Sequence, residues 1–393
     1  MKVVHVGQLH KKDDIRIFQK ECRSLAGAGY DVVYCTSDYQ GGTAGVSVID
    51  DVCVQIYPYR RKKQDGALII RLCKILFNRV TRPIGLYRDV IRNKPDIVHI
   101  HEHRLVYLVI VIKWRKRNIK VIYDAHEDSE HERYEHDMKK YGVFLANAFV
   151  KIHGFIEHLA CRHADVVIAA TPHIEGLLHP YAKKITTVKN YPILSQEAEV
   201  TRVGGGRIVC YVGGMSEDRS TTMLIEISDK ISGSLYLAGP IDKEYYSTLA
   251  NNYKETQQKK WFYKGILNRE EVERLYSICD VGVCIFKKTR NNFYALPTKL
   301  FEYMRAGLPI VASEFPLWKE IIQGANCGVC VNENNLEDIC SKINYLLDHP
   351  EEASILGKNG QHAVKQKYNW NIEEKKLLQV YKDLSYMRRG NKR

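Results

Sequence analysis

Short runs of β-branched and apolar residues alternate with longer amphipathic stretches along most of the 393 residues. In the first half, the runs that predict strands are 2–6, 31–36, 53–57, 97–101, 120–123, 166–169 and 185–188. In the second half they are 208–212, 234–238, 261–264, 281–286, 309–313 and 328–331. Helical patterns lie between them, for example over 14–28, where Gly29 follows as a helix C-terminus favours. This alternation predicts βαβ units and parallel sheets.

Residues 194–207 interrupt the alternation with a polar run that contains three consecutive glycines, 204–206. Such a composition favours a linker. The chain is also long enough for two hydrophobic cores rather than one. We therefore expect an α/β protein of two doubly wound halves, whose strand carboxyl ends and following loops surround a shared central cleft.

Composition places the chain among folded proteins, since 45% of its residues are hydrophobic and 27% are charged. Residues 1–7 are too short and too interrupted by polar positions for a signal peptide. The longest strongly apolar run, 105–112, falls far below the roughly 20 residues that span a bilayer. We therefore expect a cytoplasmic protein.

The 11 cysteines are scattered, and several lie inside predicted strands, where a reduced Cys behaves as a small hydrophobic residue. Cys327 and Cys330 have the spacing of a metal or redox pair. Neither a second pair nor a His cluster accompanies them in the sequence. The core interpretation is therefore favoured over a metal or redox function.

The net charge of +13 is concentrated in residues 60–94, where 11 Lys and Arg residues face only Asp65 and Asp89. Apolar residues are interleaved with the basic ones, a pattern typical of contact with an anionic membrane surface. A solvated helix face over the core is the close alternative. Nucleic acid ranks last, because no recognised nucleic-acid module or aromatic stacking platform accompanies the charge.

The strongest candidate site lies in residues 296–309. Pro297 marks the start of a predicted helix and Gly307 its end. Free N–H groups at a helix N-terminus suit a diphosphate, and Lys299 in the first turn adds a full positive charge. Glu302 shares a helix face with Lys299, and its carboxylate can accept hydrogen bonds from a ribose diol. The alternative is an ordinary surface helix with an ion pair between residues three apart.

A second candidate site follows the strand predicted over 208–212. Gly213 and Gly214 at the strand end allow a ligand to approach the backbone. Arg219, entering the next helix, can reach the same diphosphate with its planar guanidinium. A plain tight turn is the alternative interpretation of the two glycines.

A third candidate site is Asp124, His126, Glu127 and Asp128, directly after a predicted strand. His126 could hydrogen-bond a sugar hydroxyl or assist at the reacting centre, although a lone His is more often structural. The carboxylates beside it also suggest a metal, but the ligand spacing is incomplete and we favour a site without metal.

Two further segments are expected to line the cleft. His99, His101 and His103, with Glu102, suggest a similar metal site, but because alternate residues share one face of a strand, we take them as the cleft edge of a predicted strand. The loop 7–14, with His10, and Arg16 at the start of the next helix are candidates for contact with an acceptor. A charged turn is an equally good interpretation of this loop.

Together these residues resemble the family 4 retaining glycosyltransferases of the GT-B fold, over nearly the whole chain. The most specific segments are Asp13 to Glu21, Asp124 to Glu127, Asn190 to Pro192, Gly213 to Arg219, and Pro297 to Pro309. Within the family, the chain most resembles the subgroup that builds bacterial O-antigen, capsule and exopolysaccharide repeat units.

The resemblance implies two Rossmann-like domains with parallel sheets facing a central cleft. The first domain would be 1–195, with 371–393 crossing back as a C-terminal helix to pack on it, and the nucleotide-sugar domain would be 205–370. His126 and Glu302 would be catalytic, and Asp124 would join His10 and Arg16 in acceptor contacts. The donor-binding residues would be Gly213, Gly214, Arg219, Thr298, Lys299, Leu300 and Glu302. Retention without a metal or other cofactor is likewise implied by the family.

The chain departs from the family pattern at two positions. Counting back seven residues from Glu302 places Tyr294 where the family often has a first glutamate. A Lys that usually follows a few residues after Arg219 is also absent, and Lys264 is a candidate substitute. Both departures concern the donor sugar, so the resemblance does not identify it.

The sequence thus predicts transfer of a hexose-type sugar from a UDP- or GDP-linked donor to a glycan acceptor, expected to be lipid-linked at the inner membrane face. Two alternatives stay open. One is a nucleotide-sugar epimerase or hydrolase on the same fold. The other is a non-catalytic, membrane-associated partner in polysaccharide assembly, which the missing glutamate motivates.

Overall fold

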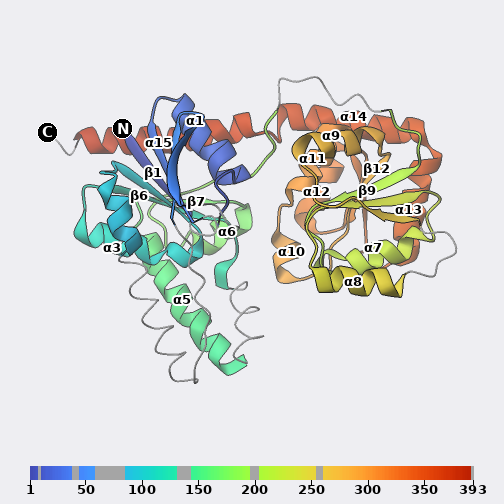
Figure 1. Ribbon diagram of the computed structural model, residues 1–393, viewed down its shortest axis with the longest axis horizontal. Helices are drawn as coiled ribbons and strands as arrows, with labels where there is room; N and C mark the ends of the chain where they lie inside the picture. Colours follow the sequence, from blue (N-terminus) through green and yellow to red (C-terminus); the bar gives the residue numbers. More distant parts are fainter. Residues whose placement is uncertain are drawn as a thin grey trace. The chain divides into compact units, whose positions relative to one another are not determined.

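The computed structural model describes residues 1–7, 10–37, 44–57, 85–130, 143–194, 203–253 and 260–390. The chain divides into two compact units, each an α/β layer structure (Figure 1). Unit 1 comprises Met1–Asn190 and Asn371–Arg393, and unit 2 comprises Tyr191–Trp370. Both units contain parallel sheets flanked by helices, so the prediction of two Rossmann-like halves is confirmed.

The sheet of unit 1 has the strand order β3-β4-β2-β1-β5-β6-β7-β8. The strands are β1 (Lys2–Gly7), β2 (Asp31–Thr36), β3 (Gly45–Ile49), β4 (Val52–Ile56), β5 (Ile97–His101), β6 (Lys120–Ala125), β7 (Val166–Ala169) and β8 (Ile185–Thr187). All neighbours are parallel except β3 and β4. The sequence patterns did not predict β3, since Val46 and Val48 of this edge strand remain exposed.

The central strands of unit 1 are buried on both faces, which explains their nearly continuous apolar sequences. The helices of this unit are η1 (Ile15–Cys22), α1 (Arg23–Gly27), η2 (His103–Leu105), α3 (Tyr107–Arg115), α5 (Val143–His163) and α6 (Pro172–Leu178), with most of α15 (Trp370–Gly390). The helix predicted over 14–28 thus begins as a π-helical turn, capped by the Asp14 carboxylate, and continues as α1.

Helix α15 packs on the unit 1 sheet although it is last in the sequence. The Tyr381 hydroxyl hydrogen-bonds with His99 Nδ1 at 2.7 Å and lies 3.4 Å from His5 Nε2. Near the start of the helix, Glu373 accepts a hydrogen bond from the Lys189 backbone N–H at 3.0 Å. These polar contacts attach the C-terminal helix to strands β1 and β5 and to the segment after β8.

The sheet of unit 2 has the order β11-β10-β9-β12-β13-β14, and all of its neighbours are parallel. Its strands are β9 (Ile208–Val212), β10 (Ser234–Ala238), β11 (Trp261–Tyr263), β12 (Val281–Cys284), β13 (Ile310–Ser313) and β14 (Gly328–Val331). The order of connection reverses between β9 and β12. Loops at the carboxyl ends of such a strand pair form the usual ligand site of an open α/β sheet.

The helices of unit 2 cover both faces of its sheet (Figure 1). They are η3 (Glu217–Arg219), α7 (Thr221–Ser228), α8 (Lys243–Asn252), α9 (Arg269–Ile278), α10 (Arg290–Tyr294), α11 (Thr298–Ala306), α12 (Pro316–Ala325), α13 (Leu336–Asp348) and α14 (Pro350–Gln366). Helix α11 has the predicted bounds, with Pro297 at its N-cap and Gly307, at φ 71°, at its C-cap.

The described cysteines are all free thiols. Cys327 is fully buried and Cys330 partly buried, and burial raises their pKa to about 12 and about 11. Thiols with such high pKa values are poor nucleophiles and poor metal ligands at neutral pH. This result supports the core interpretation of the pair.

Candidate functional site

The N-terminus of α11 presents a buried lysine. Pro297 provides no side-chain cap for this helix, so the N–H groups of Thr298 and Lys299 are open to an anion, whereas that of Leu300 donates to the Pro297 carbonyl at 3.2 Å. The Lys299 side chain is 5% exposed, and its Nζ has no hydrogen-bond partner. Burial, together with the positive charge of Arg219, lowers the pKa of Lys299 to about 7, although Cys284 and Glu302 oppose this shift.

Aromatic rings surround the Lys299 amino group. Its Nζ lies 3.5 Å from the ring centroid of Tyr211 and 4.9 Å from that of Phe286. The Arg219 guanidinium lies 5.1 Å from the same Phe286 ring. Cation–π contacts lower the cost of holding two cations here, but they do not neutralise either one. The arrangement therefore favours a multiply charged anion such as a diphosphate.

The backbone after β9 makes room for this lysine. Gly213 has φ 140°, and a Cβ built there would lie 3.0 Å from Lys299 Nζ. Its N–H donates to the Ala238 carbonyl at 2.8 Å, which holds the turn against the end of β10. Gly214 follows, and its carbonyl accepts a hydrogen bond from the Tyr211 hydroxyl at 2.7 Å. Gly213 thus has a steric role that a plain tight turn does not require.

Glu302 lies one turn after Lys299 on α11. It is partly buried, and its Oε2 lies 3.3 Å from the Tyr276 hydroxyl, which can donate to it. One carboxylate has several lone pairs, so this contact leaves capacity for a ligand hydroxyl. Thr298 is partly buried in the same first turn, whereas the Leu300 side chain is fully buried in the core and only its backbone could contact a ligand.

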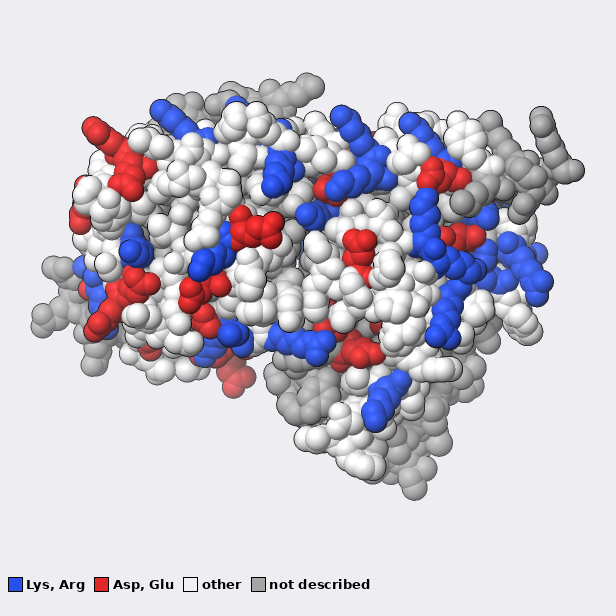
Figure 2. Space-filling view, turned by 180° about the vertical axis from the view of Figure 1, so that it is seen from behind, with Lys and Arg blue, Asp and Glu red and all other residues white. Residues whose placement is uncertain are grey.

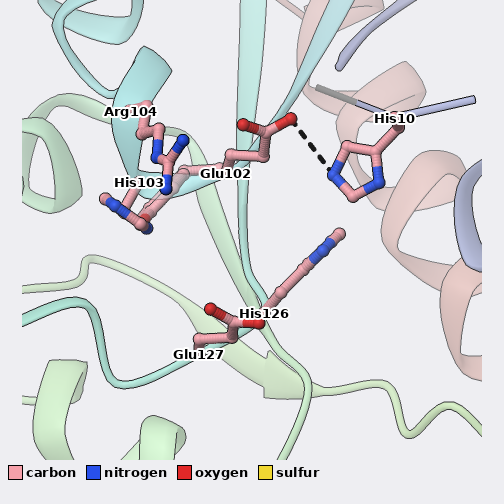
Figure 3. Close-up of a pocket in the computed structure, with 7 residues that line it drawn as sticks. His10, Glu102, His103, Arg104, His126 and Glu127 are labelled. Carbon is pink, nitrogen blue, oxygen red and sulfur yellow. Dashed lines mark ion pairs between the residues drawn. The ribbon is translucent and has the colours of Figure 1, made fainter. Parts of the chain in front are cut away.

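Unit 1 contains a polar pocket of about 180 Å³ at the carboxyl ends of its strands (Figure 3). Its lining residues come from the ends of β1, β5 and β6 and are His10, Glu102, His103, Arg104, Tyr123, His126 and Glu127. The pocket therefore combines carboxylates, imidazoles and a guanidinium. Such a mixture of donors and acceptors can satisfy the hydroxyl groups of a sugar.

A buried ion pair between Arg16 and Asp124 holds His126. Arg16 binds Asp124 in a bidentate manner, with Nη2–Oδ1 at 2.9 Å and Nε–Oδ2 at 3.2 Å. His126 Nε2 lies 2.7 Å from Asp124 Oδ2, and His101 Nδ1 lies 3.1 Å from the same oxygen. Although burial opposes it, the charge of Arg16 holds the pKa of Asp124 well below its usual range. The carboxylate thus orients His126.

His10 forms a second polar unit in the pocket. Its Nδ1 lies 2.9 Å from Asp14 and its Nε2 lies 3.1 Å from Glu102 (Figure 3). Burial lowers the pKa of His10, but its hydrogen bonds with Asp14 and Glu102 outweigh burial and raise it to about 10. The imidazole is therefore protonated at neutral pH. Its ring lies 5.7 Å from that of His126, centroid to centroid.

Two family profiles match the chain along most of its length. The first, a glycosyl transferase 4-like domain, matches residues 16–190, and the second, glycosyl transferases group 1, matches residues 195–363. The chain thus carries two glycosyltransferase family domains in succession, a glycosyl transferase 4-like domain followed by a glycosyl transferases group 1 domain. Its N-terminal half is of the glycosyl transferase 4-like type, and its architecture is GT-B.

Curated relatives of this glycosyltransferase are distant. A sulfoquinovosyl transferase of Arabidopsis thaliana is 26% identical over 309 residues, which are 74% of this chain and 57% of that protein. An uncharacterised glycosyltransferase of Methanocaldococcus jannaschii is 26% identical over 181 residues, 45% of each chain. The chain therefore spans about half the length of these curated relatives.

Solved structures resemble the glycosyltransferase in fold. Sucrose-phosphate synthase from Thermosynechococcus elongatus has a TM-score of 0.76 at 16% identity, covering 98% of this chain and 100% of that chain. HepE of Anabaena in complex with UDP-glucose has a TM-score of 0.69 at 10% identity, with the same coverage. At such identities the likeness establishes the fold alone.

The structure brings the predicted donor-binding residues of unit 2 to one edge of its sheet, as described above. The three tentative acceptor residues differ in exposure. His10 lines the unit 1 pocket, whereas Arg16 is 6% exposed and Asp124 fully buried, with their charged groups bound to each other. Arg16 and Asp124 are thus not exposed to a ligand, and Asp124 instead positions the pocket residue His126.

Two groups of described residues have the chemistry of metal ligands. They are His5, Glu21, His99 and His101, and His101, Asp124 and His126, with ligand atoms within 4.8 Å of one another. The expectation that His99 and His101 line a cleft is not met, since both are fully buried beneath the pocket. Many of these ligand atoms already pair with one another, as in the 2.9 Å contact of His5 Nδ1 with His101 Nε2. A site that functions without metal stays a prediction.

Tyr294 and Lys264 are the residues that concern the two departures from the family pattern. Tyr294 ends α10, and 41% of its surface is exposed. Lys264 follows β11 at the sheet edge, and its Nζ lies 4.0 Å from the ring centroid of Tyr236. The structure therefore places aromatic partners around Lys264.

Sequence patterns did not single out two kinds of residue in these sites. Tyr211 and Phe286 hold the Lys299 amino group, but in the sequence they are ordinary apolar strand residues. Arg104 lines the pocket without a motif of its own in the sequence, whereas Glu102 was noted there only as a possible metal ligand beside the His-rich strand. The position of both residues just after a buried strand was the available signal for a pocket.

Proposed function

We propose that this glycosyltransferase moves a hexose from a UDP- or GDP-linked donor to a glycan acceptor, with retention and without a metal. We further propose that the acceptor is lipid-linked and that the reaction serves bacterial surface polysaccharide synthesis at the cytoplasmic face of the membrane. The observation that carries the proposal is the buried Lys299 amino group without a hydrogen-bond partner, beside Arg219.

A buried ammonium without a hydrogen-bond partner costs folding free energy, which a protein retains where a ligand supplies the missing partner. Arg219 adds a second cation, and the N-terminus of α11 adds open N–H groups. This combination supports a diphosphate next to a ribose held by Glu302. HepE, a protein of similar fold, is described in complex with UDP and with UDP-glucose, which supports a UDP-linked donor.

The unit 1 pocket supports the other half of the reaction. His126 is held by Asp124 and faces a cavity lined by carboxylates and cations (Figure 3). In the proposed reaction, His126 hydrogen-bonds a hydroxyl of the transferred sugar near the reacting carbon. The charge of Lys299 and Arg219 stabilises the leaving diphosphate in unit 2.

Thermal unfolding with a panel of UDP-, GDP-, CMP- and dTDP-linked sugars tests the donor site. A ligand that binds only the folded protein raises the unfolding temperature. We expect a shift with a UDP or GDP sugar that is lost in Lys299→Ala and in Glu302→Ala. Lys319→Ala is the control, because Lys319 is an exposed lysine that lies 3.8 Å from Glu314. Full binding and transfer in both site variants would refute the donor assignment.

Membrane contact is proposed through residues 60–94, although positions 60–84 lie outside the described residues. Helix α5 offers additional support. Its Phe144, Ile152 and Phe155 side chains are 87%, 59% and 68% exposed, with Lys151 beside them. In Figure 2, most described side chains on the part of unit 1 that protrudes downward are neither acidic nor basic. Among the described residues, no helix is long and apolar enough to cross a bilayer.

Sedimentation with anionic liposomes tests this contact. We expect binding that weakens with salt and falls when residues 60–63 are changed to Ser, because contacts between exposed charges are screened. Phe155→Ser should weaken the salt-resistant part of binding. Equal sedimentation with neutral and anionic liposomes, or none with either, would refute the proposed membrane partner.

The name of one fold relative, sucrose-phosphate synthase, favours a second class of acceptor, a small sugar or sugar phosphate. Acceptor assays with free sugars, sugar phosphates and lipid-linked glycans separate these two classes. Product formation from the donor alone would instead support an epimerase or a hydrolase. Failure to bind any nucleotide sugar would support a non-catalytic assembly partner. Nucleic acid is not a proposed partner.

A further inference from the structure

Glu102 has a backbone conformation that L-residues rarely adopt. Its φ is 77° and its ψ is 138°, directly after strand β5. Ser220 and Asn326 also have positive φ, but their ψ values of 30° and 52° lie in the left-handed helical region. The region that Glu102 occupies is largely restricted to glycine. A glutamate at this position therefore costs stability, and such strain concentrates at binding sites.

Contacts on both sides hold this conformation. The Glu102 carbonyl accepts a hydrogen bond from the Leu105 N–H at 3.2 Å, which starts η2. The Glu102 carboxylate lies 3.1 Å from His10 Nε2, and the other nitrogen of that ring lies 2.9 Å from Asp14. An imidazolium between two carboxylates is a rigid support. The strained backbone and this support together direct the Glu102 carboxylate into the pocket (Figure 3).

The chemistry of the pocket indicates its ligand. Glu102 and Glu127 contribute hydrogen-bond acceptors, Arg104 contributes donors, and the positive charges of His10 and Arg104 offset the negative charges of the two carboxylates. The Glu102 side chain is 11% exposed, so its carboxylate is largely desolvated. Hydrogen bonds to a charged, desolvated group are stronger and more directional than those to an exposed one. A ring with several hydroxyl groups matches this set of donors and acceptors.

We propose that Glu102 determines acceptor specificity: its carboxylate, held by a strained backbone and by His10, accepts hydrogen bonds from hydroxyl groups of a pyranose acceptor in the unit 1 pocket. The proposal rests on the proposed glycosyl transfer and names the residue that recognises the acceptor. The proposed role of Glu102 is to bind the acceptor, and it adds no chemical step to the proposed glycosyl transfer.

Steady-state kinetics of Glu102→Gln test the acceptor role. Release of UDP from UDP-glucose, and of GDP from GDP-mannose, is measured with and without a panel of octyl hexosides that differ in hydroxyl configuration. We expect the acceptor KM to rise about tenfold or more, the loss for one hydrogen bond to a charged group. The donor KM should rise much less than the acceptor KM, because Lys299 and Arg219 of unit 2 are proposed to bind the donor diphosphate. Asp31→Asn, at the opposite end of the unit 1 strands and 61% exposed, is the matched control.

Stability measurements test the strain without any substrate. Glu102→Ala removes the carboxylate but keeps a Cβ, whereas Glu102→Gly also relieves the backbone. We expect the Gly variant to unfold several degrees above the Ala variant, the opposite of the usual order for these residues. A Gly variant that unfolds at or below the temperature of the Ala variant would overturn the strain argument.

The remaining outcomes separate this proposal from the proposed function. An unchanged acceptor KM in Glu102→Gln, or a donor KM that rises as much as the acceptor KM, would overturn the acceptor role while transfer itself stands. Donor hydrolysis by the unaltered protein that no octyl hexoside stimulates would also overturn it. Failure of the unaltered protein to bind or hydrolyse any donor would instead refute the proposed function.

Discussion

Arg16 and Asp124 form a bidentate ion pair in the interior of unit 1, 108 residues apart in sequence. The Arg16 guanidinium also donates to the Val188 carbonyl at 3.0 Å, so one side chain links η1 to β6 and to the residue after β8. Because Asp124 also lies 2.7 Å from His126, this pair connects the stability of unit 1 with the orientation of a pocket residue.

Asp124→Asn should destabilise the protein by about 3 kcal/mol, because it leaves the buried Arg16 charge without its main partner. Urea unfolding measures this change. Asp383→Asn is the control, since Asp383 pairs with Lys184 on the surface, where solvent screens the pair, and its loss should destabilise the protein far less. Equal effects of the two substitutions would contradict the importance of the buried pair.

Binding of UDP-glucose should take up nearly one proton at pH 8 and almost none at pH 6. The pKa of Lys299 is lowered to about 7, so the free amino group is mostly neutral at pH 8, and a diphosphate favours its charged form. Calorimetry in two buffers with different ionisation enthalpies measures the uptake. Proton uptake that persists in Lys299→Met would assign the effect to another group.

The free energy of unfolding should rise with pH from about 7 to 9, relative to Lys299→Met. Folded Lys299 loses its proton near pH 7, while an unfolded lysine keeps its proton up to its ordinary value of 10.5. The unfolded chain therefore binds one more proton in this range, and stability increases by about 1.4 kcal/mol per pH unit. Denaturant unfolding at several pH values measures the slope, and parallel curves for the two proteins would contradict the buried, neutral lysine.

Gly213→Ala should weaken UDP binding at least about tenfold and lower stability by about 1–2 kcal/mol, because the residue has φ 140° and a Cβ there would meet Lys299. Gly214→Ala provides a control at the adjacent position. A Cβ at Gly214 meets no heavy atom within 4 Å, so its effect on stability should stay within about 0.5 kcal/mol. Calorimetric titration with UDP compares the two variants, and equal losses would indicate a general effect on the turn.

Treatment with EDTA should leave transfer unchanged, since Lys299, Arg219 and the α11 N-terminus supply positive charge for the diphosphate. Initial rates before and after chelation, with Mg²⁺ or Mn²⁺ added back, measure the requirement. Loss of activity that either ion restores would show that the proposed metal-free site is incomplete.

Local sequence determined the secondary structure of this protein to a large extent. Helix α11 begins after Pro297 and ends before Gly307, as predicted, because caps act through neighbouring backbone groups. The parallel strands were found because burial on both faces demands short apolar runs. Strand β3 was missed for the corresponding reason, since its exposed valines pair with β4 without entering the core.

Tertiary structure decided which charges are buried and which groups they meet. The sequence shows Lys299 as a basic residue near a helix start, but its lowered pKa depends on burial, with Arg219 nearby and the rings of Tyr211 and Phe286 around it. Likewise, the sequence marks Arg16 only as a candidate for acceptor contact, whereas in the structure its guanidinium meets a carboxylate 108 residues away. Capping and periodicity depend on residues a few positions apart, whereas burial and charge pairing depend on distances that only the packed chain defines.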